Sequence, residues 1–339
     1  MTPAYLLGQI DGENISSLSA DAILVTADVL YELNAHATCK LVYRQSPDNR
    51  FPIEEWIGKG LRVIAVDAGG AELILFSGVA SSVDLHYEIS GSYNLVIEGV
   101  SQSMRMDLRP RLRSHPRKNL RGHLQDLLEA TSLNLNTAYS EEGPRSFEMG
   151  LLQIGETDFE FFRRLVDRFG LAFRVTVDGI KVLDHYVDAG CSVNWRTESG
   201  LLDFRMSGRL GAADFSGVVY NRNEAMSYDR DVLSIPGKFG TAASLIDSAL
   251  AGSSDNHWSG YVDTPFISRS EQGLADEIEL ESQRSTLTRT YGTGQSREAS
   301  IRPGQKVTIN ALHHAARVEQ TARHQVARAD GGSRRRSRR

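Results

Sequence analysis

Long apolar runs are absent from this chain of 339 residues. No stretch approaches the ~18 uncharged apolar residues that a membrane-spanning helix requires. The first eleven residues also lack the basic segment and apolar run of a signal peptide. We therefore expect a protein made soluble in the cytosol, which would leave the cell only by a route that needs no signal peptide.

Cysteine is scarce, and the motifs of common enzymes are missing. The two cysteines, Cys39 and Cys191, form no Cys-x-x-Cys pair, and we interpret them as structural thiols in a reducing compartment. There is no Gly-x-Ser-x-Gly elbow and no phosphate-binding loop ending in Gly-Lys-Ser. Gly292-Thr293-Gly294 predicts a two-glycine turn and nothing more.

Charge is unevenly spread along the chain. The net charge is -5, yet residues 313–339 hold eight arginines and two acidic residues. That segment has almost no apolar side chains, so we expect a disordered Arg-rich tail. Its end, Arg334 to Arg339, is typical of nucleic-acid patches, but a solvated basic tail is the interpretation we favour. The acidic remainder of the chain argues against specific nucleic-acid binding.

What is present is ordinary globular composition, with 40% hydrophobic and 24% charged residues. In residues 1–108 the pattern predicts strands at 61–66, 72–76, 79–88 and 93–98. The third of these alternates Val83, Leu85, Tyr87 and Ile89 with polar residues, as a strand with one wet face does. The connecting turns are short, which favours antiparallel pairing in a small barrel or sandwich.

Residues 109–194 change character. Arg109 to Pro116 resembles a linker, and an amphipathic helix is expected over 118–131. A second helix is expected over 157–169, because Thr157 and Glu160 have the spacing of a capping box and Gly170 stands where the helix should end. A hairpin over 171–184 follows, with Asp178-Gly179 as a tight primed turn.

Residues 195–312 carry mixed signals. Strands are expected at 201–206, 215–220 and 306–309, the last after a turn at 302–305. Helices are expected at 242–250 and 273–290, the second with an apolar stripe at Leu274, Ile278 and Leu287.

One stretch, from Gln153 through Thr157-Asp158-Phe159-Glu160 to Gly170-Leu171, resembles a signature of the VgrG and phage late control gene D family. Members of that family share, in this order, a Gln, an acidic residue, Asp-Phe, a second aromatic residue, Arg-Leu and Gly. Three shorter segments add to the resemblance, namely Leu75 to Val79, Asp107 to Pro110 and Ile301 to Val307.

The resemblance implies an α+β, mainly β fold of two tube-like antiparallel β-barrels with a helix-plus-hairpin insertion between them. We accordingly divide the chain into a first barrel (1–108), the insertion (109–194), a second and incomplete barrel (195–312) and the tail (313–339). The implied function is that of a structural baseplate hub in a contractile injection system, such as a phage tail or type VI secretion. A homotrimer would join the tail tube protein to a spike or needle protein, beside other baseplate proteins. The acidic body of the chain permits a further hypothesis: if acidic residues line the central channel, they would repel passing DNA.

The resemblance ends near Asn310 to His313, before the expected last strand and needle. Two explanations stay open: a stand-alone hub whose spike is a separate protein, or a C-terminal segment from a shifted reading frame. We favour the second, because a barrel that lacks a strand leaves an unpaired edge.

Catalytic and metal sites were considered for two sets of residues. Glu156, Asp158 and Glu160 lie close in sequence, but residues 158 and 160 are about 200° apart on a helix, and acids in a first turn favour the helix dipole. His313, His314 and His324 fall in the expected tail without supporting ligands. We predict no catalytic residue, metal or cofactor. The alternative is a tail-associated enzyme that degrades the cell wall through an unrecognised active site.

Overall fold

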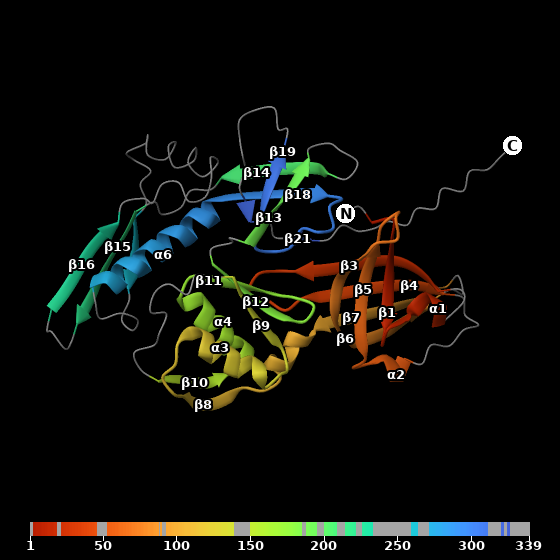
Figure 1. Cartoon of the computed structure of the whole chain (residues 1–339), viewed down its shortest axis with the longest axis horizontal. Helices are drawn as coiled ribbons and strands as arrows, with labels where there is room; N and C mark the ends of the chain where they lie inside the picture. The colour runs from red at the N-terminus through yellow and green to blue at the C-terminus, as the bar shows by residue number, and fades with distance from the viewer. Residues whose placement is uncertain are drawn as a thin grey trace. The chain divides into compact units, whose positions relative to one another are not determined.

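The computed structural model describes residues 3–18, 22–45, 53–87, 89, 93–138, 150–184, 188–194, 200–208, 214–221, 226–232, 259–263, 271–310, 320–321 and 324–325. The chain divides into two compact units. The first contains Met1–Ala189, Ser296–Gln305 and Arg323–Arg339, and the second contains Gly190–Gln295 and Lys306–Ala322. Strands predominate in both, so the α+β, mainly β class is confirmed (Figure 1).

The first unit is built on one eight-stranded sheet with the order β2-β1-β5-β6-β7-β4-β3-β21. Every pair of neighbours in it is antiparallel, as the short turns predicted. No ladder among the described strands closes this sheet into a barrel. Its elements are β1 (Tyr5–Ile10), β2 (Glu13–Asn14), α1 (Ile15–Leu18), β3 (Ile23–Tyr31), β4 (Thr38–Gln45), α2 (Ile53–Trp56), β5 (Gly60–Val66), β6 (Glu72–Tyr87), β7 (Tyr93–Ser101) and β21 (His324–Gln325).

Alternation of side chains gives this sheet its buried face. On β5, Leu61, Val63 and Ala65 are fully buried. Successive side chains of a strand point to opposite faces, so these three share one side. Each large apolar side chain buried in this way stabilises the fold by about 1.5–3 kcal/mol before entropy is counted.

Strand β6 corrects two of the sequence-based expectations. The runs predicted at 72–76 and 79–88 are one continuous strand, because β5 pairs through the gap, with Arg62 opposite Ser77 and Leu61 opposite Gly78. The predicted apolar face is buried only in part. Val83 is 9% exposed, whereas Tyr87 is 76% exposed near the tip of the hairpin.

The insertion follows β7 through a 3-10 helix and contains two helices, a two-stranded ribbon and a three-stranded sheet. The predicted helices and hairpin are present. The segment interpreted as a linker, 109–116, is instead largely the strand β8, which pairs with a strand about forty residues later. The elements are η1 (Gln102–Asp107), β8 (Arg111–His115), α3 (Leu120–Glu129), β9 (Asn134–Ala138), β10 (Leu151–Glu156), α4 (Asp158–Arg168), β11 (Leu171–Val175) and β12 (Gly179–Asp184).

The two helices share one apolar core with the hairpin. Leu124 and Leu128 of α3, Phe161 and Phe162 of α4 and Phe173 of β11 belong to this cluster. The rings of Phe162 and Phe173 meet edge to face with centroids 5.1 Å apart, a favoured aromatic geometry. The apolar side chains of α4 therefore form its buried face.

The turn of the hairpin differs from the prediction. Val175 pairs with Ile180, and the Thr176 amide donates to the Gly179 carbonyl at 2.8 Å, so residues 177 and 178 form the turn. Residues 177–179 all lack the positive φ that a primed turn requires. Gly179 has another role. It pairs with Asn134 in the parallel ladder of β12 and β9, and a Cβ there would lie 2.1 Å from the Asn134 carbonyl oxygen.

The second unit contains three small sheets and one long helix among its described residues. The sheets are β13-β19-β20, β14-β18 and β16-β15-β17, so the strands described here do not join in a single second barrel. The elements are β13 (Asp188–Asn194), β14 (Leu201–Gly208), β15 (Asp214–Asn221), β16 (Met226–Val232), β17 (Ser259–Asp263), α6 (Glu271–Arg289), β18 (Thr290–Ser296), β19 (Gln305–Asn310) and β20 (Gln320–Thr321).

Helix α6 carries the predicted stripe. Leu274 and Ile278 are fully buried against Val219, with Phe215 and Tyr228 beside them. Leu287 lies in the helix, but the surroundings of its side chain are not described. The helix predicted at 242–250 lies outside the described residues. The glycines of Gly292-Thr293-Gly294 are wrongly predicted as a turn, since they lie within β18.

The predicted domain boundaries stay a prediction, since the compact units do not separate residues 1–108 from 109–194. Within the expected tail, 313–339, the described residues are those of β20 and β21, each a two-residue strand. His313, His314 and Arg334 to Arg339 lie outside the described residues.

Gly179 offers a test of why glycine is needed. We expect Gly179→Ala and Gly179→Asn to lower the free energy of unfolding similarly, by about 1–3 kcal/mol, because either Cβ overlaps the backbone of β9. Gly170, with φ +65° at the end of α4, is the control. There Asn should cost less than Ala, since Asn tolerates the left-handed region. Urea denaturation measures both pairs. If Gly179→Asn is as stable as the parent, glycine is not needed there for room beside β9, and the primed-turn interpretation is favoured again.

Candidate functional site

A group of polar side chains surrounds the first turn of α4, and we name it the helix-cap cluster. It lies in the first unit and joins η1, β8, β10, α4 and the segment before β4. Its members are His36, Ser103, Asp107, Arg111, His115, Gln153, Glu156, Thr157, Asp158, Glu160 and Arg164.

The capping box predicted from the sequence is present. The Thr157 hydroxyl accepts from the Glu160 amide at 3.1 Å, and the Glu160 carboxylate accepts from the Thr157 amide at 2.9 Å. Thr157 has the extended backbone of an N-cap, with φ -73° and ψ 165°. Two amides that the helix leaves without partners are thereby satisfied. The Thr157 hydroxyl also donates to Asp107 at the end of η1, which ties the cap to that element.

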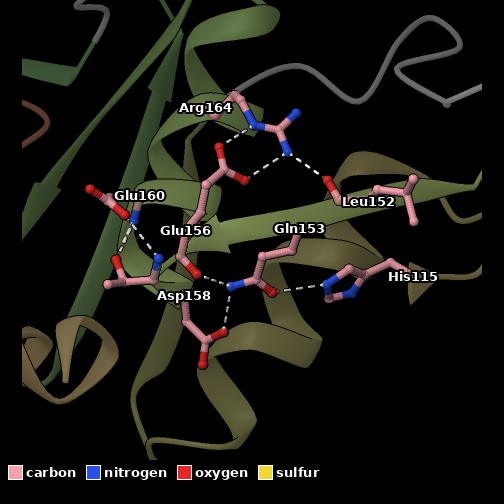
Figure 2. Close-up of polar contacts among 8 residues, drawn as sticks. His115, Leu152, Gln153, Glu156, Asp158, Glu160 and Arg164 are labelled. Carbon is pink, nitrogen blue, oxygen red and sulfur yellow. Dashed lines mark hydrogen bonds and ion pairs between the residues drawn. The ribbon is translucent and has the colours of Figure 1, made fainter. Parts of the chain in front are cut away.

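Gln153 is the buried centre of the cluster. Its side chain is 0% exposed. Its amide nitrogen donates to the Glu156 carbonyl at 3.0 Å and to the Asp158 carboxylate at 3.1 Å. Its amide oxygen lies 3.2 Å from Nε2 of His115, which is also buried. Figure 2 shows Gln153 between His115 and Asp158. One amide group therefore links the end of β10 to the start of α4 and to the end of β8.

The three acids weighed as a paired-carboxylate site are held apart by different partners. Asp158 is buried and forms an ion pair with Arg111 of β8 at 3.1 Å. Glu156 binds Arg164 through both oxygens, at 2.8 and 2.9 Å, and Arg164 also donates to the Leu152 carbonyl (Figure 2). Glu160 caps the helix. Each carboxylate has a structural role, so the interpretation of Glu160 as a cap is confirmed.

His36 connects the cluster to the first sheet. One of its ring nitrogens, Nδ1, lies 2.8 Å from the Ser103 hydroxyl, and Nε2 lies 3.3 Å from the Asp107 carboxylate. The ring stacks on Phe159 of α4, with centroids 3.7 Å apart. Ser103 further contacts the hydroxyl of Ser101, which accepts from the Ala37 amide.

Serine, histidine and aspartate in this order are the groups of a nucleophilic triad. If Nε2–H donates to Asp107, Nδ1 is free to accept the Ser103 proton, as a general base would. A triad must also admit substrate, however, and the Ser103 side chain is 1% exposed. A substrate carbonyl group therefore cannot reach the Ser103 hydroxyl unless the surrounding packing opens.

The protonation state of His36 follows from its surroundings. Burial lowers the pKa of His36, and this effect exceeds the opposing effect of the hydrogen bond and charge of Asp107. The neighbouring Arg163 lowers that pKa further. The neutral ring that results fits one donor and one acceptor nitrogen.

A second polar junction secures the hairpin to the first sheet. Asn34 adopts φ +58°, which Asn tolerates. Its amide donates to the Phe173 carbonyl and its side chain accepts from the Phe173 amide, both at 2.8 Å. Asn34, in the loop between β3 and β4, therefore binds both backbone groups of Phe173 on β11.

The turn that resembles the family near Ile301 belongs to the first unit. Arg302 donates to the Ile74 carbonyl of β6, and Arg174 of β11 donates to the Pro303 carbonyl at 2.8 Å. Gly304, with φ +81°, closes the turn before β19. The segment therefore binds both the first sheet and the insertion.

The other candidate residues show no shared site. Cys39 is buried, which raises the pKa of its thiol to about 12, and neither it nor Cys191 forms a disulfide. His324 lies in β21. Within the described ranges, no three His, Cys, Asp or Glu side chains are grouped as metal ligands. No helix in the described part of the chain is long and apolar enough to cross a membrane.

Sequence reasoning missed His36, Ser103 and Asp107 as one network. Their separations of 67 and 71 residues along the chain leave no local pattern. Gln153 was noticed as part of the signature, but its role as a buried bridge depends on β8, which was predicted as a linker. The sequence signal that could have predicted this bridge is an isolated Gln just before a capping box, together with a His on a neighbouring strand.

Comparison with known proteins gives a structural answer. No protein-family profile and no curated protein sequence matches the chain. Solved structures do. A 43 kDa tail protein of prophage MuSo2 from Shewanella oneidensis aligns with TM-score 0.66 and 11% identity, covering 92% of this chain and 90% of that one.

Two further structures agree. The E. coli protein c3393 is a component of the type VI secretion system with structural similarity to the T4 tail proteins gp27 and gp5. It aligns with TM-score 0.60 and 12% identity over 92% of this chain and 69% of that one. A tail protein from Neisseria meningitidis aligns with TM-score 0.60 and 12% identity over 90% and 85%. The chain thus has the fold of phage tail and type VI secretion proteins, which confirms the resemblance drawn from its sequence.

The cap can be tested by substitution. Thr157→Ala should lower the free energy of unfolding by about 1–2 kcal/mol, because it removes the N-cap acceptor and the donor to Asp107. Thr157→Ser and Glu160→Gln are the matched controls, since each keeps the groups of a capping box. Denaturant unfolding is the measurement. If alanine and serine at residue 157 are equally stable, the hydroxyl does not hold this helix.

The burial of His36 predicts a pH dependence. A histidine whose pKa is lowered by folding leaves stability unchanged above its unfolded pKa of about 6.5, and stability is lost as pH falls from there towards the folded pKa. His123 of α3, whose pKa burial also lowers, adds a loss of the same sign. His36→Gln removes the titration at residue 36 and keeps an amide for Ser103 and Asp107. The difference in unfolding free energy between parent and variant should therefore shrink or reverse as pH is lowered from about 7.5 to 5. A constant difference across that range would count against a neutral His36 ring in the folded protein.

Proposed function

We propose that the chain is a structural baseplate hub of a contractile injection system, which forms a homotrimer and joins the tail tube to the spike. The observation that carries the proposal is the alignment with a prophage tail protein over 92% of this chain and 90% of that one. The likeness extends over both units, not over a single small sheet.

The helix-cap cluster supports a structural role. Its carboxylates, amide and hydroxyls are committed to partners within the chain, and its serine is buried. Such a network fixes the insertion rigidly against the first sheet, because a buried polar group left unsatisfied is costly. A component that transmits force between tube and spike benefits from this rigidity.

The proposal includes assembly into a tail or injection particle, with a tube protein and a spike protein as partners. It also holds that the chain is not an enzyme. The alternative, a cell-wall-degrading enzyme, draws on the Ser103, His36 and Asp107 geometry described above.

The oligomeric state is the first test. Purified chain should elute as a species of three times the 37.4 kDa chain mass, measured by light scattering over a range of concentrations. A closed symmetric ring has a fixed number of subunits, so the mass should not increase beyond the trimer as concentration rises. A chain that stays monomeric at the highest concentration, alone and with its tube protein, would contradict the trimeric hub.

The enzyme alternative is tested on the same preparation. A fluorophosphonate probe should leave Ser103 unlabelled, and a peptidoglycan zymogram should show no clearing. Labelling or clearing that disappears in Ser103→Ala, with the fold intact by circular dichroism, would replace the structural proposal by a hydrolase.

A further inference from the structure

The ribbon of β8 and β10 has an unusual distribution of side chains. Its inner face carries two buried polar side chains, Gln153 and His115 at 0% and 3% exposure, beside Leu151, which packs against the core of the insertion. Its outer face is apolar, with Leu112 at 83%, Leu152 at 57% and Ile154 at 65% exposure. An antiparallel ribbon that covers a core normally has the opposite arrangement.

The three exposed side chains form one patch. Leu112 and Ile154 are direct partners in the ladder, and Leu152 is two residues from Ile154 on the same face. Single apolar side chains on a surface need no explanation, whereas a contiguous exposed patch is a candidate contact site.

The two edges of this ribbon differ. At the edge of β10, the Leu152 carbonyl accepts from Arg164 at 2.9 Å, so it points away from β8. In an antiparallel pair, residues opposite each other turn their backbone groups inward together or outward together. Ser114 lies opposite Leu152, so its backbone N–H and C=O groups point to the far edge of β8. The same holds for Leu112, two residues before Ser114. No described strand pairs with that edge.

The surroundings of β8 are basic. Residues 108–119 contain four arginines and one lysine and no acidic residue. Arg111 and Lys118 have carboxylate partners within the chain, Asp158 and Asp126. Arg109, Arg113 and Arg117 are exposed and form no ion pair with a residue that the structure describes.

We propose that the far edge of β8 and the patch of Leu112, Leu152 and Ile154 bind an extended segment of another protein in which acidic and apolar residues alternate. The segment adds a strand to β8, places its apolar side chains on the patch and its acidic ones beside the arginines. Basic residues also guard edges against pairing, but a guarded edge does not need three exposed apolar neighbours. This docking surface goes beyond the hub proposal, which does not require it.

The test uses the full chain and a fluorescein-labelled peptide that alternates glutamate and valine, with fluorescence anisotropy as the readout. We expect saturable binding that weakens as salt rises, and little binding of the same peptide with lysine in place of glutamate. Leu112→Ser should weaken binding about tenfold or more, since loss of roughly 1.4 kcal/mol is a factor of ten. Ser114→Pro should do the same, because it removes an outward amide while leaving the ladder with β10.

Ile57→Ser is the matched control, because Ile57 is 55% exposed outside this ribbon. Its binding should equal that of the parent, and thermal melts should show that every variant is folded. Equal affinity for the glutamate and lysine peptides, or unchanged affinity in folded Ser114→Pro, overturns the proposal. It is also overturned if Leu112→Ser alters the oligomeric mass but not peptide binding, since a second copy then covers the patch. A trimer that binds no peptide removes this inference and leaves the hub proposal intact.

Discussion

The insertion depends on how the N-terminus of α4 is capped and packed. That end of the helix contacts η1, β8 and β10, and Asp158 and Phe159 of its first turn are buried. Thr157 and Glu160 satisfy two of its amides, and the Gln153 amide connects the start of the helix to His115 of β8. The aromatic face of α4 is buried against α3 and β11. His36, stacked on Phe159, extends the same constraint to the first sheet.

The sequence predicted most fully the elements whose determinants are local. Helix α4 has its cap, its apolar stripe and its terminal Gly170 within fourteen residues, and the structure contains all three. Strand β8 was mistaken for a linker because two prolines and three arginines suggest exposure, while its partner β10 follows about forty residues later. Gly179 was assigned to a primed turn because Asp-Gly is the preferred pair for such turns, although a glycine can also be needed where another strand approaches closely. Only the parallel neighbour β9 reveals that the glycine provides room.

The polar site shows the same division between local and distant information. The capping box was found from spacing, whereas the His36, Ser103 and Asp107 network joins residues separated by 67 and 71 positions. Its groups are those of a hydrolytic triad, yet Ser103 is only 1% exposed. Residue type alone therefore does not identify a catalytic site, because a nucleophile must also be accessible to substrate. The same fold occurs in tail proteins at 11–12% identity, so the architecture of sheet and insertion persists while most side chains differ.

The central claim is that this architecture assembles into a ring at the end of a tail tube. Electron cryomicroscopy of the purified chain, alone and bound to its tube protein, tests it most directly. The account predicts a closed ring with three-fold symmetry around a central channel, in which each copy contributes both units. A two-fold particle, an open filament or single copies on the tube would contradict it.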